Sequence, residues 1–343
     1  RQFQTYSATF TEPWLGGRRP NAFSVSLSHT VQNLFGGIYG TGRDRVGAFN
    51  ISGLTLSLGR QLQKPDDFFS LSNSLSYQRY VLENYDVFRI GLASGVSNSI
   101  SFNTTLSRNS VDNPQFSRSG SSISLSVSLT PPFSLLQSNR NFSAESPAER
   151  YKFIEYHKWM FDATWYTPLV GKLVLSTRAH LGFLGSYNKN LVSPFERFVV
   201  GGSGLTGQGG FNIARDIIGL RGYADNSIGP QGANQGNGGG ATGSASGGVA
   251  YDKFVMELRY PISLNPSATI FVLGFAEGGN NWGSFREYNP LNLYRSVGVG
   301  ARIFMPAFGL IGIDYGYCFD TVPGQPDAGG KGRFHFTIGQ QFR

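Results

Sequence analysis

The sequence has one cysteine, Cys318, and four histidines among its 343 residues. A single cysteine excludes an intrachain disulfide framework and any multi-cysteine metal site, and so few histidines argue against a His-rich site. Charged residues make up only 15% of the chain, whereas ordinary soluble domains contain roughly 25%. No stretch approaches the roughly 18 consecutive apolar residues of a transmembrane helix, so we expect no such helix.

Aromatic residues and glycine are abundant instead. Aromatics make up 14% of the chain, and its 46 glycines are about twice the usual share of roughly 7%. The formal net charge is +8. Low charge, many aromatics and no long apolar run leave two classes of protein. One is a large soluble β-protein, and the other is a transmembrane β-barrel, whose strands hide their apolar residues by alternation.

Apolar and polar side chains alternate over most of the chain. In residues 122–129 apolar side chains alternate with serines, and the same period of two occurs in 171–183 and 297–303. A period of two predicts β-strands with one apolar face. That face meets the core in a soluble sandwich and lipid in a membrane barrel, so the period alone does not separate the two classes.

The lengths of the connections separate them. The predicted strands are residues 2–11, 21–31, 46–59, 68–82, 97–109, 119–130, 153–167, 171–187, 249–261, 268–282, 294–304, 308–318 and 332–342. The connections alternate between short ones and long ones, the longest being 188–248. Short turns on one rim and long loops on the other are typical of outer-membrane barrels. We therefore predict an all-β fold, a transmembrane antiparallel β-barrel in the bacterial outer membrane, with residues 1–343 as one domain.

The count of 13 predicted strands is odd. Bacterial single-chain barrels normally have an even number of strands. If the long loops face the outside of the membrane, the first predicted strand would also begin on that side. Either this count is off by a strand, or further strands of the barrel lie upstream of residue 1.

The connection 188–248 is far longer than a loop without structure of its own normally is. It contains Gly201-Gly202-Ser203-Gly204, then Gly219-Leu220-Arg221-Gly222-Tyr223, then a Gly-rich tract over 229–248. Arg221 places a fixed charge where the backbone can fold tightly, because glycine tolerates conformations that other residues avoid. A solvated loop arginine is the simpler interpretation, and these residues alone leave it open.

The loop motif also resembles a known family. Leu220-Arg221-Gly222-Tyr223 is similar to the sixth-loop motif of the BamA superfamily of outer-membrane assembly and secretion barrels. Residues 275–282 resemble the family's aromatic-x-Asp-x-Gly-x-x-Trp strand, with Glu277 in place of Asp, and residues 334–342 resemble its C-terminal recognition strand. Family barrels have about 16 strands. The resemblance therefore implies that this chain holds strands 4–16, with three strands and soluble POTRA repeats upstream.

The resemblance implies that the sixth loop folds into the barrel and that Arg221 pairs with acidic residues of the wall. The candidate partners are Glu257 and Glu277. Alternation puts Glu257 and Arg259 on the inner face, opposite the apolar residues Phe254, Met256, Leu258 and Tyr260. In the alternative arrangement, Glu257 pairs with Arg259 or Arg302 of the wall and not with the loop.

Glu277 fits the alternation less well. It shares its parity with Phe271, Leu273 and Phe275, which on a lipid-facing side would exclude an inward carboxylate. We therefore expect a β-bulge to reset the register before Glu277.

The predicted C-terminal strand has Phe334, Phe336, Ile338 and Phe342 on its lipid-facing side. An ordinary lipid-facing strand would have this pattern too. The resemblance implies two roles, recognition during the chain's own insertion and formation of a seam with the first strand of the barrel. Gly339 would weaken pairing at that seam.

The function implied by the resemblance is that of an outer-membrane protein insertase, which templates incoming strands at the seam. The alternatives are a TamA-like assembly factor, a two-partner secretion translocator and, more remotely, a passive porin. The residues contain no enzyme motif, and we expect neither cofactor nor metal. The implied partners are unfolded outer-membrane proteins, accessory lipoproteins of the BAM complex, periplasmic chaperones and outer-membrane lipids including lipopolysaccharide, with no nucleic acid.

Overall fold

The computed structural model describes residues 3–17, 21–36, 44–84, 92–136, 141–142, 144–189, 191–204, 214–230, 247–265, 267–306, 309–323 and 329–338. Its strands are β1 (Phe3–Glu12), β2 (Asn21–Phe35), β3 (Arg45–Gln61), β4 (Phe69–Glu83), β5 (Gly95–Asn109), β6 (Gly120–Leu129), β7 (His157–Pro168), β8 (Val174–Gly185), β9 (Arg197–Val200), β10 (Arg215–Ile218), β11 (Ala250–Asn265), β12 (Ala268–Trp282), β13 (Tyr294–Met305), β14 (Gly309–Cys318) and β15 (Gly332–Ile338).

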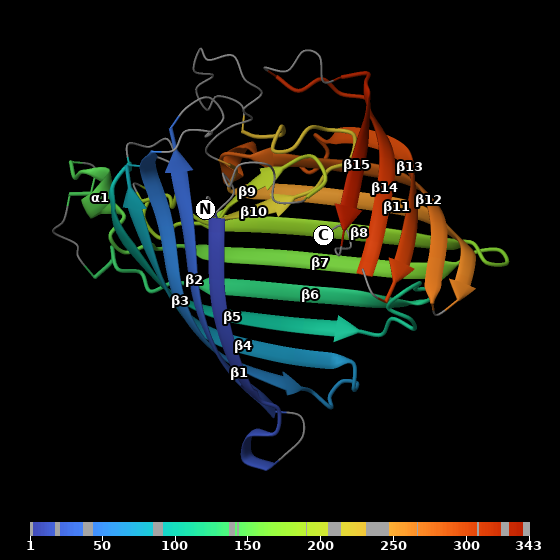
Figure 1. Ribbon diagram of the computed structural model, residues 1–343, viewed down its shortest axis with the longest axis horizontal. Coiled ribbons are helices and arrows are strands. Elements are labelled where there is room, and N and C mark those ends of the chain that lie inside the picture. The colour runs from blue at the N-terminus through green and yellow to red at the C-terminus, as the bar shows by residue number, and fades with distance from the viewer. Residues whose placement is uncertain are drawn as a thin grey trace. The chain divides into compact units, whose positions relative to one another are not determined.

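Thirteen strands form one sheet in the order of the chain, β1 to β8 followed by β11 to β15 (Figure 1). Every pair in this sheet whose register is described is antiparallel. The all-β, antiparallel fold class predicted from the alternation is confirmed.

Helical structure in the described ranges consists of α1 (Pro147–Arg150) and the 3-10 turns η1 (Leu15–Gly17) and η3 (Phe285–Glu287). Among these residues, no helix is long and apolar enough to cross a membrane.

Most predicted strand boundaries lie within a few residues of the observed ones, and the exceptions have local causes. The strand predicted over 153–167 begins only at His157, because Ile154 first makes an isolated backbone hydrogen bond to Asn98 at 2.8 Å. The strand predicted over 171–187 begins at Val174, because the Leu173 N–H closes a turn by donating to the carbonyl of Val170 at 3.0 Å.

The residues group into two compact units. The first consists of residues 1–107, 125–159 and 184–195, and within it β1 to β4 pair consecutively. The second consists of residues 108–124, 160–183 and 196–343, and within it β8 pairs with β11 and β11 to β15 pair consecutively. The second unit contains all the candidate site residues.

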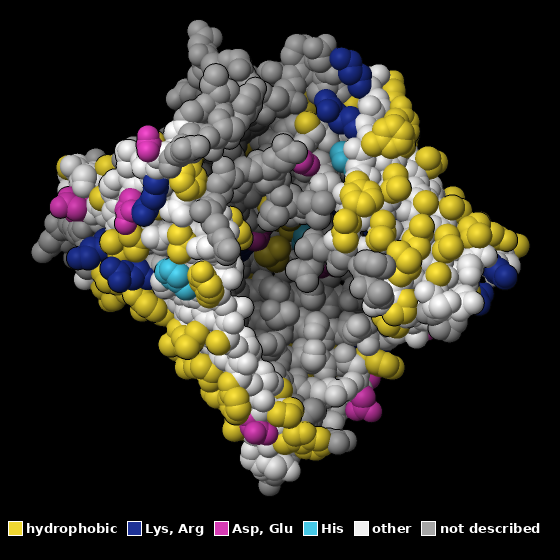
Figure 2. Space-filling model, viewed as in Figure 1, with side chains coloured by type: hydrophobic (Ala, Val, Ile, Leu, Met, Phe, Trp, Pro, Cys, Tyr) yellow, Lys and Arg dark blue, Asp and Glu magenta, His cyan; other side chains and the backbone are white. Residues whose placement is uncertain are grey.

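Strand β11 shows the two faces of the sheet in this unit. Phe254, Met256, Leu258 and Tyr260 are exposed on the outer face, where 55% of Met256 is accessible. Lys253, Val255 and Glu257 are buried on the inner face. The predicted assignment of these faces is therefore correct. Figure 2 shows hydrophobic side chains gathered on the right of the view, where Figure 1 places β12 to β15.

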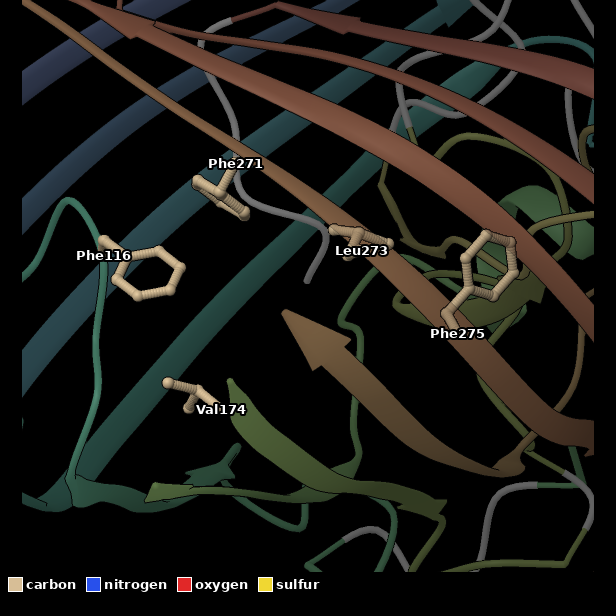
Figure 3. Packing of buried hydrophobic residues seen from close by; sticks show 5 residues of the cluster. All are labelled: Phe116, Val174, Phe271, Leu273 and Phe275. Carbon is tan, nitrogen blue, oxygen red and sulfur yellow. The ribbon is translucent and has the colours of Figure 1, made fainter. Parts of the chain in front are cut away.

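The bulge predicted before Glu277 is absent. β11 and β12 pair in continuous register from Ala250↔Trp282 to Pro261↔Phe271, so Phe271, Leu273, Phe275 and Glu277 share the inner face. The three apolar side chains pack there with Phe116 and Val174 (Figure 3), and the Phe116 and Phe271 rings lie 5.2 Å apart. No change of register is needed because the apolar run of β12 faces an internal core and not lipid.

Candidate functional site

Two short strands position residues 196–204 and 214–230 of the long loop against the inner face of the second unit. β9 and β10 pair in parallel, from Arg215↔Arg197 to Ile218↔Val200. On the other side of β9, Phe198 and Gly248 exchange backbone hydrogen bonds of 3.0 and 2.7 Å. The side chain of Asn281 in β12 donates to the carbonyl of Phe198 at 3.0 Å. These bonds anchor the described part of the loop to β12.

Glycine at position 222 permits the tight approach of the loop to β13 and β14. Gly222 has a φ of +91°, a conformation that L-residues other than glycine rarely adopt. A Cβ at this position would lie 3.1 Å from the Cβ of Ser296 and 3.3 Å from the backbone nitrogen of Cys318. The Gly222 N–H donates to Nε2 of His335 in β15 at 2.8 Å. The motif glycine is therefore required by both conformation and space.

Arg221 is fully buried and joins the loop to three strands. Its Nε donates to Oε1 of Glu277 in β12 at 2.7 Å, and its backbone N–H donates to Oε2 of the same carboxylate at 2.9 Å. Its terminal nitrogens reach Oε1 of Glu257 in β11 at 2.6 Å and Oδ1 of Asp314 in β14 at 3.4 Å. A planar guanidinium with five donors suits this arrangement in a way that a point charge would not.

The ring of Phe275 packs against the guanidinium of Arg221. The Arg221 guanidinium carbon lies 3.7 Å from the centroid of the Phe275 ring, a cation–π contact in a fully desolvated position. Burial alone would lower the pKa of the Arg221 guanidinium, but Glu277, Glu257 and Asp314 raise that pKa above its ordinary value. The arginine therefore stays charged.

A wider set of ion pairs surrounds Arg221. Nε of Arg259 donates to Oε2 of Glu257 at 2.8 Å, and Arg302 holds Asp314 with two hydrogen bonds of 2.9 Å. Lys253 lies 3.9 Å from Oε1 of Glu277. All these side chains except Arg259 are almost completely buried. A buried charge is tolerated only when it is paired and hydrogen-bonded, so removal of one member leaves its partners uncompensated.

The aromatic residue of the motif packs on the other side. Burial raises the pKa of the Tyr223 phenol above its ordinary value, and the protonated hydroxyl donates to the carbonyl of Arg295 at 2.8 Å. Its ring lies 6.0 Å from that of Tyr294. Leu220 is fully buried. Arg221, Gly222 and Tyr223 thus contact the sheet, and the solvated-loop interpretation of Arg221 does not describe this structure.

Beside the cluster lies a cavity of about 610 Å³ within the second unit. Loop residues Ser203, Gly204 and Ile217 line part of it, and the rest is lined by the turn before β6 and by residues of β6 to β8 and β11 to β15. The lining is mostly polar or charged, as for water-filled space inside a membrane barrel.

The predicted pairing of Arg221 with both glutamates occurs, and the alternative in which Glu257 pairs with the wall and not with the loop does not. Glu257 and Glu277 lie against Arg221, and Glu257 also pairs with Arg259. Arg302 pairs with Asp314. Sequence reasoning missed Asp314, Phe275 and His335 as contacts of the loop. The parity of Asp314 within β14, opposite Ile313 and Tyr315, could have placed that carboxylate on the inner face.

The C-terminal strand has the predicted orientation where it is described. Phe334, Phe336 and Ile338 are exposed, and His335 and Thr337 are buried. Gly339 and Phe342, the remaining residues of that prediction, lie outside the described ranges. Cys318 is buried, and its Sγ contacts the carbonyl of Lys331 at 3.3 Å.

Two solved structures share this fold over 98% of the chain. BamA from Haemophilus ducreyi lacking POTRA domains 1-3 aligns with a TM-score of 0.66 and 16% sequence identity, over 61% of its own length. CdiB from Escherichia coli aligns with a TM-score of 0.54 and 13% identity, over 52% of its own length. Identities this low support similarity of fold alone.

Among curated proteins, a SAM50-like protein of Schizosaccharomyces pombe is 28% identical over 123 residues, which are 36% of this chain and 21% of that protein. The chain thus spans less than two thirds of each of these three relatives. The model of the Omp85 superfamily domain matches residues 2–342. With the BamA-like fold, this match identifies an integral β-barrel of an outer membrane. The chain belongs to the Omp85 superfamily.

Proposed function

We propose that the chain is the membrane barrel of an insertase that folds β-barrel proteins into the outer membrane. The observation that carries the proposal is the buried set of contacts around Arg221, which ties residues 220–223 to β11, β12 and β14. A passive porin has no need of a loop locked to its wall by buried charges. An assembly machine needs its wall held in one arrangement while an edge of the sheet is used for pairing.

The proposed work is strand templating. The edge of a sheet presents unpaired N–H and C=O groups, to which an incoming strand can add by backbone hydrogen bonds. We assign this role to β15, which stands at the end of the described sheet and exposes Phe334, Phe336 and Ile338 on its outer face. The process requires no covalent chemistry, and we propose that the protein is not an enzyme and uses no cofactor.

The proposed substrates are unfolded outer-membrane proteins delivered by periplasmic chaperones. Accessory lipoproteins and outer-membrane lipids, including lipopolysaccharide, are the proposed partners. The competing function is that of a TamA-like assembly factor or a two-partner secretion translocator. Because BamA and CdiB both share the fold, the fold does not separate these functions.

Depletion of the full-length protein tests the proposal. The expected result is a broad loss of β-barrel proteins from the outer membrane, measured by quantitative proteomics, with recovery when the wild-type protein is supplied. Arg221→Ala should fail to restore these barrels, whereas Arg295→Ala, which removes an exposed arginine paired with Asp320, should restore them. Loss of a single secreted protein would instead support the translocator, and unchanged outer-membrane barrels would exclude the insertase.

A further inference from the structure

The cavity of about 610 Å³ in the second unit has an excess of positive charge. Five of its lining residues are cationic and three are acidic, which leaves two positive charges when the acidic ones are subtracted. The cationic residues are Arg178, Arg221, Lys253, Arg259 and Arg302, and the acidic ones are Asp162, Glu257 and Glu277. Asp314, which is bonded to Arg302 behind the lining, reduces the excess to one.

Each of the four arginines has a carboxylate partner within hydrogen-bond distance. Arg178 donates from Nε to Asp162 at 2.9 Å. Arg259 and Arg302 hold Glu257 and Asp314, and Arg221 is held by all three carboxylates of the cluster. The guanidinium groups are therefore compensated by the protein itself.

Lys253 is the exception. Its side chain is only 1% exposed, and its nearest carboxylate oxygen, Oε1 of Glu277, lies 3.9 Å away. That oxygen already accepts from Nε of Arg221. In the described ranges the ammonium has three N–H donors and no acceptor within hydrogen-bond distance. Burial of an ammonium group without such a partner is strongly unfavourable.

The surroundings of Lys253 suit an oxyanion. The ammonium lines the cavity together with Arg178. Arg178 lies on β8 two positions before His180, and His180 is the residue that pairs with Lys253 of β11. The hydroxyl-bearing residues Ser122, Thr164 and Ser176 line the same space. Water could accept from the ammonium but would leave its charge uncompensated, whereas an oxyanion supplies both the acceptor oxygens and the negative charge.

We propose that this cavity is a binding site for a small oxyanion, a phosphate or a carboxylate, whose oxygens accept hydrogen bonds from Lys253. The site adjoins the contacts of Arg221, because Arg221 and Glu277 line the same cavity, but it does not depend on the insertase function. The bound anion would neutralise the excess positive charge of the inner wall next to Arg221. Its presence would raise the stability of the folded barrel, because a ligand that binds only the native state stabilises it.

Calorimetric titration of the full-length protein in detergent with inorganic phosphate tests the proposal, with acetate in a second series and chloride holding the ionic strength constant. The wild type should bind phosphate or acetate saturably. Lys253→Met should bind at least tenfold more weakly, and Lys253→Arg should retain binding. Lys172→Met is the matched control, because Lys172 is exposed in the turn before β8, and its affinity should equal that of the wild type.

The response of the two anions identifies the source. Binding of phosphate alone indicates a free inorganic ion or a phosphate ester, and binding of both indicates that a carboxylate also fits. Absence of saturable binding to the wild type would overturn the proposal, and so would equal affinities of the wild type and Lys253→Met. If Lys253→Met does not fold, the wild-type titration and the Lys253→Arg variant still decide the outcome.

Discussion

At the scale of single residues, the position of the loop depends most on Arg221. Its guanidinium binds carboxylates on three strands and lies over the ring of Phe275. Lysine could supply the charge but neither the planar fork nor the stacking surface. The arginine thus acts through geometry as much as through charge, and two substitutions at this position should differ in effect.

Arg221→Ala should lower the free energy of unfolding by about 3–5 kcal/mol, because it leaves buried carboxylates without their cation. Arg221→Lys should lose less, since Lys retains the charge. Urea unfolding of the purified barrel in detergent measures both effects. Arg295→Ala serves as control, because 66% of the Arg295 side chain is exposed beside Asp320, and only a small loss is expected there. Equal losses in Arg221→Ala and Arg295→Ala would show that the buried ion pairs contribute no more to the free energy of unfolding than the exposed pair does.

Gly222 offers a second test at this scale, because a side chain there would cost free energy in two ways, through backbone strain and through overpacking. Gly222→Ala incurs strain from the positive φ of +91° and tight contacts of the new Cβ with Ser296 and Cys318. Gly171 in the turn before β8 has a φ of +61°, and a Cβ there would meet nothing within 4 Å. Gly171→Ala should therefore cost about 1–2 kcal/mol from backbone strain alone. Gly222→Ala should cost a further 1–3 kcal/mol or so from overpacking.

The same unfolding measurement compares the two glycine variants. Similar losses in both would mean that β13 and β14 move aside for the added methyl group. In that case, the close approach of the loop would not be needed for its position.

At the scale of elements, strands were predictable because alternation reports directly which face of a sheet is apolar. The outward residues of β11, such as Met256, were assigned correctly for this reason. β12 misled the same rule. Its inner face carries apolar residues that form a core with Phe116. Alternation alone assigns such residues to the lipid-facing side, which conflicts with the inward carboxylate of Glu277 on the same face. Parity distinguishes two faces but does not say which of them meets lipid.

The loop contained less predictable structure. β9 and β10 have four residues each and pair in parallel, so neither gives a period long enough to recognise. The partners of Arg221 were named only through a family resemblance. The alternation of β14 places Asp314 on the inner face, but alternation does not say which inner-face carboxylate Arg221 binds, and the two residues lie 93 positions apart. Charge pairing of this kind is set by the packed sheet and not by the sequence nearby.

The lipid-facing assignment of β11 yields a prediction at this scale. Met256→Arg places a cation on the exposed outer face near the middle of a 16-residue strand. The expected loss in free energy of unfolding in lipid bilayers is about 2–4 kcal/mol. Met256→Leu keeps the position apolar and should cost less than about 1.5 kcal/mol. A loss from Met256→Arg that is equally small in bilayers would contradict contact of this face with the hydrocarbon.

At the scale of the whole molecule, low charge and exposed apolar residues agree with each other. Charged residues make up 15% of the chain, and those of the second unit's inner face are largely paired around Arg221. The outer face of that unit exposes Phe254, Met256, Leu258, Val299 and Ile313. A soluble protein rarely tolerates so extended an apolar surface. The surface and the superfamily membership therefore lead to one arrangement, with lipid outside and ion pairs inside.

Tryptophan fluorescence tests this arrangement for the intact protein in liposomes. Trp165 on β7 is 45% exposed, whereas Trp282 at the end of β12 is 6% exposed and packs 4.8 Å from the ring of Tyr288. Variants that retain one of these tryptophans, with the other three replaced by Phe, should differ in quenching by lipids brominated on their acyl chains. Trp165 should be quenched strongly, and most by bromines near the headgroup, because exposed tryptophans in membrane barrels gather at the interface. Trp282 should be quenched weakly, because protein covers it. If acrylamide in the aqueous phase quenches Trp165 and brominated lipids do not, this face of the second unit is not in contact with the bilayer.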